Sequence, residues 1–207
     1  DADLLVASEI HEIGRGDGET HVLLTQATAI REEWLRELYP DDFSERVAVD
    51  WDSAAKRAVA RREILFRDLP LASRPLDPPP AEEAAQQLAA AVLSGECPLK
   101  HWDRAVDQWI ARVNHLAKTC PDWELPAYGE AERELIIQQI CHGAVSYKDI
   151  KDRPVLHTVK SLLAPAQTAL VEQHMPERVT LSNGRAVKVQ YADAAEPFVS
   201  ARIQELF

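Results

Sequence analysis

The chain has 207 residues, of which 46% are apolar, so it can bury one large hydrophobic core or two small ones. Its 34 acidic and 23 basic residues give a formal net charge of −11, which argues against a protein whose whole surface binds a phosphate backbone. No apolar run approaches the roughly 20 residues of a membrane span, and three widely spaced cysteines favour a reducing, cytoplasmic setting over a disulfide framework.

The first 30 residues predict an antiparallel β-hairpin. The apolar run over 4–10 and the run rich in Val, Leu and Thr over 21–30 are typical of strands. Three glycines within residues 14–18 indicate an exposed loop between them. A phosphate-binding loop is the alternative for these glycines, but such a loop leads into a helix and here a strand follows.

A short helix and a second hairpin come next. Ile30, Trp34 and Leu38 are spaced as one face of a helix, and Pro40 ends it. The elements expected here are a helix over 30–38, strands over 47–51 and 58–65, and a turn over 52–57.

A proline-rich segment marks a domain boundary. Pro75 and the three prolines at 78–80 have no amide hydrogen and a fixed φ, so they favour an extended, semi-rigid connector. We therefore predict a β-rich domain over residues 1–75 and a helical domain over residues 76–207.

Apolar residues at helical spacing dominate the second predicted domain. The expected helices span residues 81–94, 103–119, 128–142, 155–163 and 165–173. The Asn183-Gly184 pair, flanked by β-branched residues, predicts a hairpin over 178–191. The order of strands, helices and a last hairpin indicates an α+β fold.

Positive charge is concentrated in one segment. Residues 51–75 carry 6 basic and 3 acidic residues, whereas residues 1–50 carry 4 basic and 13 acidic residues. The candidate nucleic-acid-binding residues are Lys56, Arg57, Arg61, Arg62 and Arg67.

If this segment is one extended strand, Arg57, Arg61 and Arg67 share a face, and Lys56 and Arg62 lie on the other. Arginine on a strand face can bond phosphates and stack on bases. Alternatively, these side chains protect an edge strand from aggregation, or they pair with the acidic first 50 residues. Both interpretations remain open.

The sequence carries no recognisable catalytic or metal-binding set. The Cys and His residues lack the close paired spacing of structural zinc sites, and no serine lies in a Gly-x-Ser-x-Gly turn. The acidic clusters fall on predicted helices beside arginines, which is typical of solvated helix faces. We predict no catalytic residue, no metal and no cofactor in this segment.

Several stretches resemble known helicases. Residues 4–43 resemble the end of the OB-fold region of DEAH-box helicases, a match carried by Trp34, Leu35, Pro40 and Phe43. The segments VDWD at 49–52 and VARREILF at 59–66 resemble the region that follows in HrpB-type helicases. The closing segments SNGRAVKVQY and PFVSARIQELF resemble the C-terminal signature of the same helicases, a match carried by Pro197, Arg202, Gln204, Glu205 and Phe207.

The resemblance implies the C-terminal region of a longer ATP-dependent helicase, with a partial OB-like antiparallel region over 1–75. ATP and Mg²⁺ are then implied for motor domains elsewhere in the parent chain, because the helicase motifs are absent from this sequence. The absence of an initial Met and the apolar last residues also lead us to expect a fragment.

The function implied for this segment is a non-catalytic accessory one. It would assist the binding of single-stranded RNA or DNA, or brace the motor domains. The alternative is a structural or protein-interaction module with no nucleic-acid contact, and it is favoured by the net charge of −11 and by the lack of an evident aromatic stacking platform in the sequence.

Overall fold

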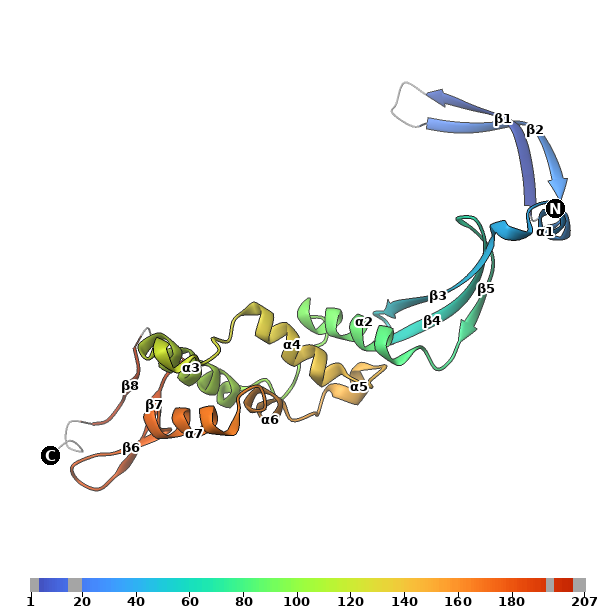
Figure 1. The fold of residues 1–207 in the computed structure, drawn as a ribbon. Coiled ribbons are helices and arrows are strands. Elements are labelled where there is room, and N and C mark those ends of the chain that lie inside the picture. The colour runs from blue at the N-terminus through green and yellow to red at the C-terminus, as the bar shows by residue number, and fades with distance from the viewer. Residues whose placement is uncertain (1–3, 15–19, 193–195, 203–207) are drawn as a thin grey trace. The chain divides into compact units, whose positions relative to one another are not determined.

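The computed structural model describes residues 4–14, 20–192 and 196–202. Antiparallel sheets and helices follow one another along the chain, which confirms the predicted α+β class (Figure 1). The chain divides into two compact units. We call Asp1–Ala48 with Arg62–Arg74 the β unit, and Val49–Arg61 with Pro75–Phe207 the helical unit. Residues 49–61 thus group with the helices that follow residue 75.

The β unit begins with the predicted hairpin. β1 (Leu4–Gly14) and β2 (Thr20–Ile30) pair antiparallel, with Leu4 opposite Ile30. The loop predicted at 14–18 lies almost wholly outside the described residues. Apolar side chains on both strands are exposed, among them Leu5, Val6, Ile10, Val22, Leu23 and Leu24.

The predicted short helix is also present. α1 spans Glu32–Leu38, and a single 3-10 turn, η1 (Pro40–Asp42), follows it. The Arg36 guanidinium lies 2.6 Å from the Glu32 carboxylate one turn earlier, a pairing that stabilises an exposed helix.

A three-stranded sheet contains the predicted second hairpin and one further strand. β3 (Phe43–Asp52), β4 (Arg57–Phe66) and β5 (Leu69–Leu76) lie in the order β3-β4-β5. β5, which contains Pro70 and Pro75, was not predicted. Proline is tolerated there because β5 is an edge strand, with one side free of ladder hydrogen bonds.

The order of the sheet corrects two details of the basic segment. β4 is the central strand, so its arginines do not protect an edge. Lys56 lies in the turn before β4 and Arg67 lies in the turn after it, both with positive φ (49° and 56°). The predicted alternation of five cations along one strand is therefore wrong at both ends.

The burial pattern of β4 changes phase in the middle of the strand. Ala58 and Ala60 are buried in the first half, whereas Glu63 and Leu65 are buried in the second. Because side chains alternate between faces, this change leaves two consecutive arginines, at positions 61 and 62, both exposed.

The helical unit contains all five predicted helices. They are α2 (Ala81–Leu93), α3 (Arg104–Thr119), α4 (Glu130–Cys141), α6 (Val155–Lys160) and α7 (Pro165–His174). α2 packs beside α4 (Figure 1). Two short elements were not predicted, the 3-10 turn η2 (Pro121–Trp123) and α5 (Tyr147–Ile150), because neither is long enough to show helical periodicity.

The core of the helical unit forms around α3. Val106, Trp109, Val113 and Leu116 are each at most 1% exposed, and they recur at the spacing of one helix face. Burial of a large apolar side chain contributes about 1.5–3 kcal/mol, so this face alone fixes the place of α3 in the unit. Asp103 caps the helix, accepting a hydrogen bond from the amide of Ala105 at 2.9 Å.

A small sheet closes the described part of the chain. β6 (Arg178–Thr180) and β7 (Ala186–Gln190) form the predicted hairpin, and β8 (Phe198–Val199) pairs with β7. Gly184 has φ 81°, and its amide donates to the Leu181 carbonyl at 2.9 Å. The turn therefore has three residues with glycine in the left-handed position, rather than two. Gln204, Glu205 and Phe207, which carry part of the resemblance, lie outside the described residues.

None of the helices in the described ranges combines the length and the apolar character that crossing a membrane requires.

Candidate nucleic-acid interface

The five predicted nucleic-acid-binding residues are all exposed. Lys56, Arg57 and Arg61 belong to the helical unit, and Arg62 and Arg67 belong to the β unit. Because Lys56 and Arg67 lie in the turns at the two ends of β4, the five residues do not form one strand face.

Three of these five cations have an aspartate partner. The Arg61 guanidinium lies 2.6 Å from Asp50, that of Arg67 lies 2.8 Å from Asp42, and that of Arg57 lies 3.5 Å from Asp77. Two of these acids come from the acidic first 50 residues, as the pairing interpretation expects. Exposed ion pairs contribute only about 0–1 kcal/mol, so a phosphate can compete for these guanidinium groups.

Rings and arginines gather at the end of β4 in the β unit. We call Tyr39, Phe43 and Phe66, with Arg36 and Arg67, the ring cluster. The Phe66 ring centroid lies 5.3 Å from that of Phe43 and 6.0 Å from that of Tyr39. Both spacings are within the range of favourable aromatic pairs.

The two arginines of the ring cluster lie over its rings. The Arg36 guanidinium carbon is 4.3 Å from the Phe43 centroid, and the Arg67 carbon is 5.6 Å from the Phe66 centroid. Both distances fit cation–π contacts. Tyr39 is 48% exposed, so much of its surface is open to a ligand.

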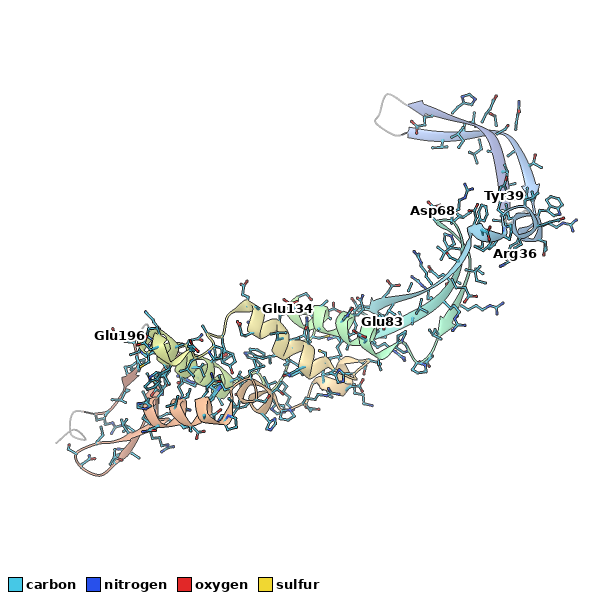
Figure 2. The ribbon with its side chains drawn as sticks, in the orientation of Figure 1. Arg36, Tyr39, Asp68, Glu83, Glu134 and Glu196 are labelled. Atoms are coloured by element: carbon cyan, nitrogen blue, oxygen red, sulfur yellow. The ribbon has the colours of Figure 1, made fainter. Side chains whose placement is uncertain are left out.

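Backbone and side-chain hydrogen bonds hold the ring cluster in place. The Arg67 amide donates to the Asp42 carbonyl at 2.7 Å, and Arg67 Nε donates to the Asp42 carboxylate at 2.9 Å. Figure 2 marks Arg36 and Tyr39 at the C-terminal end of α1 and Asp68 in the turn after β4. The cluster thus joins α1, the start of β3 and the turn after β4.

Tyr39 and Phe43 were not among the predicted site residues, although the sequence carries a signal for Phe43. Two ten-residue strands joined by a four-residue turn bring the first residue of β3 near the last residue of β4, so Phe43 meets Phe66. The predicted strand began at residue 47, which hid this pairing.

The described residues carry no grouped metal ligands. Among them, no three His, Cys, Asp or Glu side chains are placed to hold a metal ion. The three cysteines are free thiols, and burial raises the pKa of Cys141 to about 11. A thiol with so high a pKa is protonated at neutral pH and is a poor nucleophile.

Comparison with known proteins shows that this chain is similar to part of an ATP-dependent helicase. Residues 136–207 match the family described as ATP-dependent helicase C-terminal (HrpB_C). Over 198 residues the chain is 22% identical to the ATP-dependent RNA helicase HrpB of Escherichia coli (strain K12). These matches confirm the predicted resemblance to the C-terminal region of HrpB-type helicases. The alignment covers 94% of this chain and 24% of the E. coli protein, so the chain spans about a quarter of its relative's length.

Two solved structures have a similar fold. One is the crystal structure of the E. coli DExH-box NTPase HrpB, with a TM-score of 0.58 and 20% identity. The other is the crystal structure of the Escherichia coli DEAH/RHA helicase HrpB, with a TM-score of 0.57 and 18% identity. Each comparison covers 98% of this chain and 25% of the solved chain. At this identity the likeness concerns the fold alone.

Proposed function

We propose that this HrpB-type region is an accessory module of an ATP-dependent helicase and that it contacts single-stranded nucleic acid. ATP hydrolysis, with its Mg²⁺, belongs to motor domains of the parent chain in the cytoplasm, and the module assists them without a catalytic group of its own. The observation that carries this proposal is the ring cluster, where Arg67 lies by the exposed ring of Tyr39 and Arg36 lies over Phe43.

The ring cluster has the chemistry of a base-stacking surface. Bases stack on aromatic side chains with about 1–3 kcal/mol per base, whatever their sequence. Tyr39 offers an exposed ring, and the Arg67 guanidinium, 6.0 Å from its centroid, adds positive charge beside it. A single strand has unpaired bases to stack there, whereas a duplex does not.

The exposed arginines supply a second kind of contact. Arg62 projects from the same unit as the ring cluster, and no ion pair joins it to another of the described side chains. A guanidinium group can bond a phosphate with two parallel hydrogen bonds. Stacking on Tyr39 together with phosphate contacts at Arg62 and Arg67 is the expected mode of binding.

A structural role is the second candidate. The Arg61–Asp50 and Arg67–Asp42 ion pairs satisfy these cations within the chain, and the net charge of −11 disfavours polyanions. On this alternative the module braces the motor domains through protein contacts alone.

Substitution of Tyr39 separates the two candidates. We expect Tyr39→Ala to weaken the binding of a labelled oligouridine of about 12 nucleotides by about tenfold, because stacking is lost. Tyr39→Trp is expected to retain binding, because it keeps an aromatic face. Fluorescence anisotropy measures both.

Trp123→Ala is the matched control, because it removes a partly exposed ring from the other unit. Circular dichroism checks that each variant is folded. Equal affinities for Tyr39→Ala, Trp123→Ala and the unaltered chain would refute the stacking role and favour the structural one.

A further inference from the structure

A second cluster of positive charge lies wholly within the helical unit. It surrounds a pocket of about 500 Å³, lined by Ala55, Lys56, Arg57, Val145, Ser146, Tyr147, Lys148, Asp149 and Lys151. Four of these nine residues are cationic and one is acidic. Lys56 and Arg57 come from the predicted basic segment, whereas Lys148 and Lys151 were not among the predicted binding residues.

Backbone pairing brings these distant segments together. The Ala58 amide donates to the Val145 carbonyl at 2.8 Å, and the Tyr147 amide donates to the Lys56 carbonyl at 3.0 Å. Arg57 and Ser146 form an isolated antiparallel bridge. The turn before β4 is thus hydrogen-bonded to the loop before α5. These bonds hold the backbone segments that carry the four cations next to each other.

The one acidic residue of the pocket is directed to its own loop. The Asp149 carboxylate accepts hydrogen bonds from the amides of Val145 and Ser146, at 3.2 and 2.9 Å, and from the Ser146 hydroxyl at 2.8 Å. These donors hold one carboxylate oxygen, Oδ2, against the loop, and among the described side chains no ion pair joins Asp149 to a lysine of the pocket.

The four cations make only weak contacts within the chain. Arg57 lies 3.5 Å from Asp77, whose side chain is 80% exposed, and Lys151 lies 3.9 Å from its neighbour Asp152. Lys56 Nζ lies 5.3 Å from the centroid of the Tyr147 ring. No ion pair to Lys148 is found within the described ranges. All four side chains are exposed, and each can reorient towards a ligand.

We propose that this pocket binds a phosphate group of a single-stranded nucleic acid. The inference rests on the proposed function and assigns it a second site, in the other unit and with newly identified residues. A polyanion fits better than a free phosphate, because Arg61 on the same unit extends the series of cations along β4 where a phosphate displaces its exposed ion pair with Asp50. Successive phosphates can neutralise such a series, whereas one small anion cannot.

The test combines charge reversal with a map of contacts. In the 207-residue chain, the variant Lys148→Glu with Lys151→Glu is compared with Lys118→Glu and Lys188→Glu, two exposed lysines outside the pocket. Both double variants change the net charge equally. The probes are the labelled oligouridine and, separately, inorganic phosphate.

We expect the pocket variant to weaken oligouridine binding at least tenfold relative to the control variant. The slope of its log affinity against log salt should also be shallower, by the amount expected for the loss of about one phosphate contact or more. In ¹⁵N-correlated NMR spectra, the amides of Ser146, Tyr147 and Lys148 should shift when oligouridine is added.

Three outcomes would overturn the inference, and they are distinguishable. If the two double variants bind equally while Tyr39→Ala binds weakly, the pocket is refuted and the proposed function stands. If the unaltered chain does not bind oligouridine at low salt, the proposed function fails as well. If inorganic phosphate shifts the same amides and displaces oligouridine at equal phosphate concentration, the site takes a free anion and not a strand.

Discussion

Arg112 links the core of the helical unit to the segment that follows α7. It is 3% exposed, donates from Nε to the Met175 carbonyl, and lies 5.1 Å from the Trp109 ring centroid. Its other partner, Glu177, is 3.2 Å away, with a side chain that is 69% exposed. The buried hydrogen bond and the ring contact therefore stabilise the fold more than the ion pair does.

We expect Arg112→Ala to lower the free energy of unfolding by about 3 kcal/mol, because it leaves a cavity and an unsatisfied carbonyl. Glu177→Gln is the matched control, and its expected cost is below about 1 kcal/mol. Urea denaturation followed by circular dichroism measures both. Equal costs would mean that the ion pair, and not burial, is the important interaction of Arg112.

At the scale of elements, α3 begins at a well-defined cap. The Asp103 carboxylate accepts from the amides of Ala105 and Val106, at 2.9 and 3.4 Å. We expect Asp103→Ala to destabilise the helical unit by about 1 kcal/mol, whereas Asp103→Asn keeps a capping oxygen and should cost little. Thermal unfolding distinguishes them, and a similar loss in both variants would show that capping is not the cause.

The loop before α5 depends on a charged Asp149. Burial alone would raise the pKa of Asp149, but hydrogen bonds from Ser146 and Val145 and the charge of Arg153 together lower it below its usual 3.8. A carboxyl group with a lowered pKa stabilises the folded state above its unfolded pKa, and this contribution is lost as pH falls through the folded pKa.

We therefore expect the stability difference between the unaltered chain and Asp149→Asn to be constant above about pH 5 and to shrink as pH falls below the unfolded pKa. Urea denaturation at a series of pH values measures this difference. A difference that grows towards acid pH would contradict this account of the loop.

The elements differ in how far the sequence could predict them. α3 and α4 were predictable because their apolar spacing continues for several turns, and the closing hairpin because Gly184 marks its turn. β5 was not predictable, because it contains two prolines and proline is typical of a linker. Lys148 and Lys151 were not candidates, because only long-range pairing with the turn before β4 brings them to Lys56. The ring cluster was not predicted because the expected strand began at residue 47, which left Phe43 outside the hairpin.

At the scale of the whole molecule, the sequence motifs pointed to a similarity with HrpB-type helicases that the comparisons confirm, which neither composition nor charge could do. The net charge of −11 points away from a polyanion, whereas the four cations that line the pocket in the helical unit point towards one. Electrostatic binding depends on the local field near the ligand, since charges beyond about 10 Å are screened at 0.1 M salt. A basic pocket can therefore bind a polyanion even though the net charge of the chain is negative.

The most direct test of nucleic-acid contact is fluorescence anisotropy of labelled single-stranded RNA and DNA with the 207-residue chain across a salt series. We predict binding at low salt, with a log affinity that falls linearly with log salt. For each phosphate contact, the log affinity should fall by about 0.7 per tenfold rise in salt. No binding at low salt would contradict this prediction, and so would binding that salt does not weaken.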